Sequence, residues 1–97
     1  MPNLSKVKSY LGFARRAGKL TLGVNAAETL RSCYLLVADE AVGKNSRKQI
    51  ESLKTRLSCP LIYMEDLGEL VGRPGCVLAA VREEHLARAV VDAAAAE

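Results

Sequence analysis

The sequence predicts an α/β fold, a three-layer αβα sandwich built on a four-stranded sheet that is mixed but mostly parallel. The chain has 97 residues, of which 49% are hydrophobic and 26% charged, as expected for one globular domain covering residues 1–97. Short apolar runs alternate along it with segments in which apolar residues recur every three or four positions. Strands that alternate with helices in this way favour a parallel sheet with helices on both faces.

The first helix and the short segment after it are predicted from the first twenty residues. Apolar residues recur at helical spacing from Leu4 to Ala17, and either Asn3 or Ser5 can cap the helix. Gly18 suits the position after the helix, where a left-handed backbone is required. Residues 19–22 alternate polar and apolar side chains and predict a very short strand.

The middle of the chain predicts two further helices and a buried strand. We expect a second helix at about residues 25–32 and a strand at 34–38, whose continuous apolar run indicates burial on both faces. A loop with a capping residue at 43–46 should open a third helix, which Pro60 terminates.

The last third predicts two strands and two helices. Residues 61–64 form an apolar strand, and Asp66 should cap a short helix over 67–71. An exposed turn at 72–75 leads to a strand at 76–81. Glu83 and Glu84 suit the positive end of a final helix.

The net charge of +3 is distributed unevenly along the chain. Residues 1–48 contain nine Lys and Arg against three Asp and Glu, or +6, whereas residues 49–97 contain five against eight, or −3. This asymmetry indicates a basic face directed at a polyanion, although any single charge also fits a solvated helix face. The few aromatic residues, three Tyr and one Phe, argue against a stacking platform for single-stranded nucleic acid.

The three cysteines and the hydropathy indicate a cytoplasmic protein. The cysteines lie in apolar surroundings without a CxxC pair, which predicts buried free thiols in a reducing compartment. We expect no metal and no cofactor. The first residues lack the apolar core of a signal peptide, and no apolar run is long enough to cross a membrane. We therefore expect no membrane association, and a monomer.

Nothing in the sequence assembles an enzyme active site. His85 is the single histidine and has no matching nucleophile, so an exposed or capping role explains it better than catalysis. The glycines form no nucleotide-binding pattern. Asp39 and Glu40 end a strand, where α/β enzymes place acids, yet capping or solvation explains them equally well.

An RNA-binding surface is the better prediction. In a sandwich of this order, the loops before the second helix, the third helix and the last strand should meet at one end of the sheet. Lys and Arg there would neutralise phosphates, Asn25 could contact a base edge, and glycines would let the backbone approach closely. Capping of the second helix is the alternative role of Asn25. The predicted RNA-binding residues are Lys19, Gly23, Asn25, Ala26, Lys44, Arg47, Lys48, Arg73, Pro74, Gly75 and Cys76.

Several segments together resemble one protein family. They are Gly18–Leu20 with Gly23–Asn25, Ala38–Glu40 at the end of a strand, Asn45–Lys48 at the start of a helix, and Leu67–Gly72. In order and spacing they are similar to the kink-turn-binding ribosomal protein family, which includes archaeal and eukaryotic large-subunit and box C/D proteins. Residues 12–20 particularly resemble its small bacterial, YlxQ-type branch. The similarity runs from about Leu11 to Val81.

The resemblance implies an αβα sandwich and a specific mode of RNA binding. In the family, the start of the second helix enters the groove beside tandem sheared G·A pairs, where an Asn that matches Asn25 reads a guanine edge. Gly23 matches the glycine that lets the backbone approach. The segment from Arg73 to Cys76 matches the loop that shelters a flipped-out nucleotide. Binding would select the sharply bent RNA conformer.

Two positions depart from the family pattern. Ala26 and Thr29 stand where archaeal members have Glu and Lys, so two side chains that contact bases are absent. We expect a loss on the order of 1–3 kcal/mol for each good contact. The prediction is a ribosomal-type protein that docks a kink-turn-like RNA, with ribosome-associated proteins as further partners. The alternative is a protein-interaction module of the same fold that has lost RNA readout.

Overall fold

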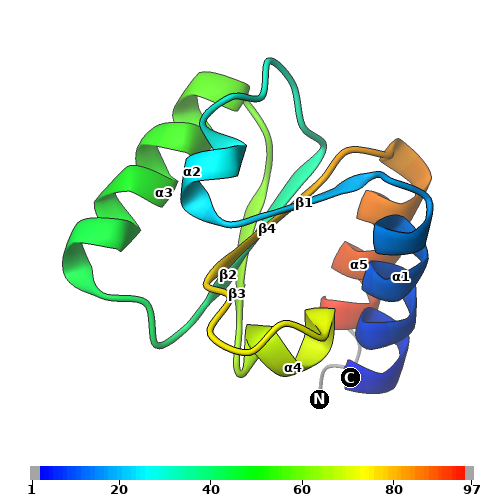
Figure 1. Cartoon of the computed structure of the whole chain (residues 1–97). Coiled ribbons are helices and arrows are strands. Elements are labelled where there is room, and N and C mark those ends of the chain that lie inside the picture. The colour runs from blue at the N-terminus through cyan, green and yellow to red at the C-terminus, as the bar shows by residue number, and fades with distance from the viewer. Residues whose placement is uncertain (1–2, 96–97) are drawn as a thin grey trace.

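The computed structural model describes residues 3–95, and residues 1–2 and 96–97 of the predicted domain lie outside the described residues. Five helices and four strands form within this range around one sheet (Figure 1). In chain order they are α1 (Leu4–Arg16), β1 (Leu20–Leu22), α2 (Val24–Ala27), β2 (Leu35–Asp39), α3 (Lys44–Leu57), β3 (Leu61–Met64), α4 (Leu67–Val71), β4 (Leu78–Val81) and α5 (Glu84–Ala95).

The sheet has the strand order β1-β4-β2-β3. Only β2 and β3 are parallel, whereas β4 runs antiparallel to both of its neighbours, with Val81 opposite Leu20 on one side and Leu35 on the other. The predicted four-stranded mixed sheet is confirmed, but the prediction that it is mostly parallel is wrong. The last strand enters the middle of the sheet in the reverse direction, which makes two of the three pairings antiparallel.

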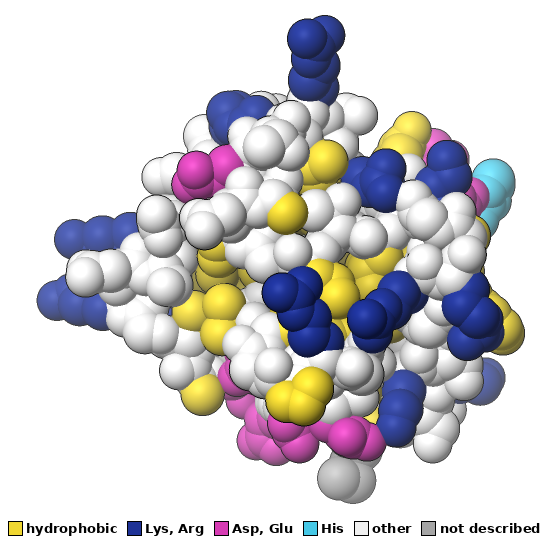
Figure 2. Space-filling model, in the orientation of Figure 1, with side chains coloured by type: hydrophobic (Ala, Val, Ile, Leu, Met, Phe, Trp, Pro, Cys, Tyr) yellow, Lys and Arg dark blue, Asp and Glu magenta, His cyan; other side chains and the backbone are white. Residues whose placement is uncertain are grey.

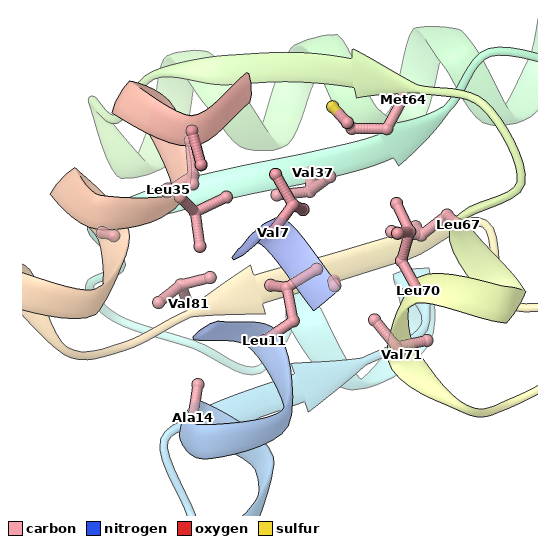
Figure 3. Packing of buried hydrophobic residues seen from close by; sticks show 14 of the residues in the cluster. Val7, Leu11, Ala14, Leu35, Val37, Met64, Leu67, Leu70, Val71 and Val81 are labelled. Atoms are coloured by element: carbon pink, nitrogen blue, oxygen red, sulfur yellow. The ribbon is translucent and has the colours of Figure 1, made fainter. Parts of the chain in front are cut away.

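The sheet is covered on both faces, which confirms the three-layer sandwich (Figure 1). Helices α1, α4 and α5 cover one face, and α2 and α3 cover the other. Alternate residues of each central strand point to opposite layers: Leu35 and Val37 join the first layer, and Leu36 and Ala38 join the second. Figure 3 shows Val7, Leu11 and Ala14 of α1 directed at the sheet beside Leu67, Leu70 and Val71 of α4.

The ends of α1 and α5 agree with the sequence predictions. The Oδ1 atom of Asn3 accepts a hydrogen bond from the Lys6 amide at 3.1 Å, and Gly18 follows α1 with φ 71°. The Glu83 carboxylate accepts from the Leu86 amide at 2.6 Å, which lowers the pKa of Glu83 and caps α5.

The second helix is shorter than predicted, because α2 ends at Ala27 rather than near residue 32. The Thr29 hydroxyl donates to the carbonyl of Ala26 at 2.7 Å, and Arg56 of α3 donates to the carbonyls of Glu28 and Leu30 at 3.0 and 2.8 Å. In a longer helix these carbonyls would accept hydrogen bonds from backbone amides one turn later. Because side chains bond to them here, the helix ends at Ala27.

The predicted burial of the three cysteines is confirmed. All three are free thiols, and Cys33 and Cys59 lie in the layer under α3. Burial raises the pKa of Cys33 and raises that of Cys59 to about 11. Both thiols are therefore protonated near neutral pH and poor nucleophiles. Among the helices of residues 3–95, none is long and apolar enough to cross a membrane.

Candidate nucleic-acid interface

Three segments that are distant in sequence meet at one end of the sheet. The Gly23 amide at the end of β1 donates to the carbonyl of Leu78 at 2.8 Å. The Asp39 amide at the end of β2 donates to the carbonyl of Val77 at 3.0 Å. The start of β4 therefore lies between the loops that lead into α2 and α3. We call this end of the molecule, formed by residues 23–26, 40–48 and 72–77, the rim.

Asn25 and Ala26 are exposed where the chain enters α2. Gly23 occupies the N-cap position with φ 97°, a conformation that glycine adopts without a Cβ penalty. Among the described residues, the Asn25 side chain has no hydrogen-bond partner, so the alternative that Asn25 caps the helix is wrong. Its amide group is free to meet a ligand through one acceptor and two donor hydrogens.

The first two turns of α3 carry the basic side chains of the rim. Gly43 is the N-cap and forms no side-chain cap bond, so the helix opens at the first residue of the loop predicted at 43–46. Lys44 and Lys48 are exposed and form no ion pair with any other described residue. Figure 2 shows Lys and Arg side chains projecting beyond the α3 side of the molecule, at the left of the view.

Arg47 is more constrained than the two lysines. Its guanidinium lies over the ring of Tyr63, 4.4 Å from the ring centre, and donates to the carbonyl of Glu40 at 3.4 Å. The Tyr63 hydroxyl in turn donates to Glu51 at 2.8 Å. Burial and this bond to Glu51 raise the pKa of Tyr63. The arrangement holds the Arg47 charge next to the loop that opens α3.

The turn before β4 is exposed at Arg73, Pro74 and Gly75, but Cys76 is not. The Arg73 side chain forms no hydrogen bond or ion pair within residues 3–95. Cys76 is buried, and its thiol donates to the carbonyl of Leu78 at 3.2 Å. The thiol of Cys76 therefore packs inward, and the place of Cys76 in a loop that closes over a nucleotide stays a prediction.

Lys19 lies at the opposite end of β1 from the rim. Its carbonyl accepts from the Arg82 amide at 2.8 Å, and Arg82 follows the last residue of β4. Because β1 and β4 are antiparallel, the end of β4 lies beside the start of β1, away from Gly23. The expectation that Lys19 shares one rim with Asn25 is wrong for this reason.

A hollow with three carboxylates lies between the turn before β4 and α4, and we call it the acidic hollow. Asp39, Asp66 and Glu69 line it, together with Gly72 and residues 74–77, and no Lys or Arg does. Acidic side chains gather at the lower edge of the molecule, beneath α4, in the view of Figure 2. This part of the rim repels phosphate.

The Asp39 carboxylate has a structural role in this hollow. One oxygen accepts from the Ala41 amide at 2.8 Å, and the other accepts from the Leu67 amide at 3.0 Å. Asp39 therefore confirms the capping alternative and caps α4 from a distant strand. Asp66, which was expected to cap α4, has a left-handed backbone with φ 55° and no side-chain cap bond.

A groove on the other side of the same turn was missed by the sequence reasoning. It runs between α1 and α4, and we call it the basic groove. Its walls include Lys8, Gly12, Phe13, Arg15 and Arg16 of α1 and the last turn of α4 with Gly72. Lys8, Arg15 and Arg16 lie off the apolar stripe of α1, and this helical spacing indicates only a face that is solvated or meets a partner. The second wall is formed by α4, and this packing of α4 beside α1 cannot be predicted from local sequence patterns.

The remaining candidates for a catalytic or metal site are His85 and clusters of His, Cys, Asp or Glu. His85 is exposed, and its Nδ1 atom lies 2.9 Å from a Glu83 oxygen. No group of three or more His, Cys, Asp or Glu side chains that could hold a metal ion occurs within residues 3–95.

Comparisons with known proteins bear on the fold alone. No family model matches the chain, and no curated protein does. A solved structure from Bacillus halodurans, described as a protein with unknown function, is similar with a TM-score of 0.74 and 22% sequence identity. The match covers 89% of this chain and 93% of that chain. This chain therefore has the same α/β fold as that protein over almost its whole length.

Proposed function

We propose that this protein binds a structured RNA, a kink-turn or a similarly bent internal loop, at the rim. The observation that supports this most is the convergence of exposed polar and basic side chains from three separate segments, without ion-pair partners among the described residues. They are Asn25 in the first turn of α2, Lys44, Arg47 and Lys48 in the first two turns of α3, and Arg73 in the turn before β4. The resemblance to kink-turn-binding ribosomal proteins supports the same choice.

Each group would have a distinct task in such a complex. Lys44 and Lys48 would neutralise phosphates and contribute affinity without sequence preference. The free amide of Asn25 would contact a base edge and contribute specificity. Gly23 and Gly75, whose φ angles are 97° and 81°, leave room for the nucleic acid to approach the backbone. The protein would act without catalysis, as a cytoplasmic monomer of ribosomal type.

The acidic hollow favours the second candidate, a protein-interaction module of the same fold. Its three carboxylates lie beside the turn that would have to shelter an extruded nucleotide. A basic protein partner, such as a ribosome-associated protein, would meet that surface more readily than a phosphate would. The two candidates differ in the salt dependence of RNA binding and in sensitivity to nuclease.

Base readout is tested by fluorescence anisotropy with two RNAs and two protein variants. The RNAs are a standard kink-turn and the same RNA with Watson–Crick pairs in place of its G·A pairs. We expect the kink-turn to bind at least about tenfold more tightly, or about 1.4 kcal/mol, and Asn25→Ala to lose that margin. Gln49→Ala, an exposed amide in the middle of α3, is the matched control and should bind like the wild type.

Phosphate contact is tested by the salt dependence of binding. Lys48→Gln should reduce the slope of log K against log salt by roughly 0.7–0.9, as expected for one lost phosphate contact. Lys54→Gln, on the same helix but away from its first turns, should leave the slope unchanged. Equal binding of both RNAs would reduce the proposal to a generic basic surface. A failure to bind either RNA would overturn it in favour of the protein-interaction module.

A further inference from the structure

We propose that the basic groove between α1 and α4 holds an unpaired nucleotide of the bound RNA, with its base stacked on Phe13 and Arg16 and its phosphate beside Arg15. This inference rests on the proposed function, because the groove would take a strand that extends beyond the RNA docked at the rim. The side chains of Phe13, Arg15 and Arg16 belong to neither the hydrophobic core nor the rim.

The groove places an aromatic ring and a guanidinium together on the surface. Phe13 is 50% exposed, although it is the only phenylalanine in the chain. The guanidinium of Arg16 lies 5.0 Å from the centre of its ring. Gly12 lies next to this pair on α1, and a Cβ there would only reach van der Waals distance, 3.4 Å, from an Arg16 nitrogen. A planar base can stack on either group, because every base has a π-face.

A second guanidinium, that of Arg15, is held in the groove by a hydrogen bond to α4. The Nη1 atom of Arg15 donates to the carbonyl of Val71 at 2.6 Å. An arginine side chain carries five donor hydrogens, so most remain available to a phosphate. Arg15 thus acts as a prepositioned cation in the groove that Phe13 also lines, and its position follows from the packing of α1 on α4.

The charge of the groove matches a phosphodiester. Lys8, Arg15 and Arg16 line it, and none of its lining residues in the described chain is Asp or Glu. Lys8 is partly neutralised, because its Nζ atom lies 2.8 Å from a Glu69 oxygen. Arg15 and Arg16 form no ion pair with a described residue. Figure 2 shows Lys and Arg side chains gathered over α1 and the adjoining end of α4.

A nucleotide fits this groove better than an acidic peptide does. An acidic peptide would satisfy the two arginines but would leave the half-exposed ring of Phe13 without a planar partner. The groove is also continuous with the rim, since Gly72 lines both the basic groove and the acidic hollow beside Arg73. Phe13 is the one aromatic residue that lines the groove, so the groove suits one base and not the extended stacking platform that the scarcity of aromatic residues argues against.

The experiment compares a blunt kink-turn RNA with the same RNA carrying a single-stranded oligoadenylate extension of about eight nucleotides, a length within the usual site size. The readout is the ratio of the two dissociation constants. We expect the extension to tighten binding of the wild type by about tenfold, and Phe13→Ala or Arg16→Gln to abolish most of that gain. The blunt RNA should bind these variants as it binds the wild type.

The matched controls remove the same groups elsewhere on the surface. Tyr34→Ala removes a ring that is 48% exposed, and Arg88→Gln removes an arginine of α5. Both should keep the gain from the extension. A 4-thiouridine placed in the extension should crosslink on irradiation to the tryptic peptide of residues 9–15, which contains Phe13 and ends at Arg15.

The same design separates this inference from the proposed function. Free oligoadenylate is titrated as well, so the groove is tested even if the kink-turn does not bind. Loss of kink-turn binding in Asn25→Ala together with groove-dependent oligoadenylate binding supports both proposals. An extension that gives no gain, or a gain that survives Phe13→Ala and Arg16→Gln, overturns the groove and leaves the rim standing. Tighter groove binding by a polyglutamate peptide overturns the nucleotide in favour of a protein ligand.

Discussion

The acidic hollow and the basic groove lie on opposite sides of one short turn and carry opposite charge. Three carboxylates and no cation line the hollow, whereas three cations and no carboxylate line the groove, within the described chain. Gly72 belongs to both. The charges that line the two surfaces cancel, so the modest net charge of +3 does not reveal this local separation of charge.

If the protein binds RNA as proposed, this contrast would direct the polyanion to one side of the turn at 72–75. Phosphates should avoid the hollow and follow the groove, because exposed charges act over about one Debye length, roughly 8 Å at physiological salt. The Lys8–Glu69 ion pair joins the two surfaces, with Lys8 in the groove and Glu69 in the hollow. The turn at 72–75 and its supports are thus the places where the contrast can be broken.

The largest effect is expected from Gly68→Ala, which disturbs the turn itself. A Cβ at Gly68 would lie 2.9 Å from the carbonyl oxygen of Arg73 and 3.1 Å from the Gly75 nitrogen. Because both atoms are backbone, the turn must move, and we expect the free energy of unfolding to fall by about 1–3 kcal/mol. Urea denaturation followed by circular dichroism measures this change.

Gly12→Ala is the matched helical control for that variant. The nearest atom to its new Cβ is the end of a flexible arginine side chain, at 3.4 Å. We expect the free energy of unfolding to rise by about 0.5–1 kcal/mol through better helix propensity. If the Gly68 variant proved as stable as this control, the close packing of the turn on α4 would be wrong.

A smaller effect is expected from Asp39→Asn in the acidic hollow. This carboxylate accepts from two amides, those of Ala41 and Leu67, whereas an amide side chain can present only one oxygen. We expect a loss of about 1–2 kcal/mol in the free energy of unfolding. Asp66→Asn, which breaks no cap bond and suits a left-handed backbone, should change it by less than about 0.5 kcal/mol. Equal losses would contradict the assignment of Asp39 as the cap.

The smallest effect concerns the ion pair that joins the two surfaces. Its hydrogen bond and the charge of Lys8 lower the pKa of Glu69, so Lys8→Gln should raise that pKa toward the usual value for glutamate. In the wild type the pair contributes its stability above the unfolded-state pKa of Glu69 and loses it as the pH falls through the lowered folded-state pKa. Carboxyl NMR titration measures the shift, and Lys6→Gln, also exposed on α1, should leave it unchanged. An unaltered titration in Lys8→Gln would mean that the pair does not form in solution.

Much of the fold was predictable because hydrophobic periodicity is local. The run at Leu35–Ala38 correctly indicated a strand buried on both faces, and the apolar run that includes Leu78–Val81 correctly indicated a strand. Strand direction was not predictable from them, since a buried antiparallel strand and a buried parallel strand have the same pattern. The reverse entry of β4 between β1 and β2 is a property of the assembled sheet.

The parts of the candidate site that lie in loops at the ends of strands were predictable from the sequence. The meeting of the loops near Asn25, Lys44 and Arg73 at one end of the sheet was predicted, but it depends on β4 running antiparallel to β1 and β2, which the prediction of a mostly parallel sheet did not include. Lys19 and Gly23 flank β1 and therefore lie at its opposite ends whatever the strand direction, and the inward thiol of Cys76 depends on how the turn before β4 packs. Asp39 capping α4 and the guanidinium of Arg15 on Val71 are contacts between residues far apart in sequence, for which a single sequence carries no signal.

The place of β4 between β1 and β2 has a consequence for synthesis of the chain on the ribosome. Within the described sheet β1 has no partner other than β4, so residues 20–22 must wait until residues 78–81 have been made. At about 5–20 residues per second this delay is roughly 3–11 s. The parallel pair of β2 and β3 can form earlier, but one edge of β2 stays open until β4 arrives. The nascent domain therefore spends seconds with an apolar strand edge unpaired, which is the interval in which a chaperone would be needed most.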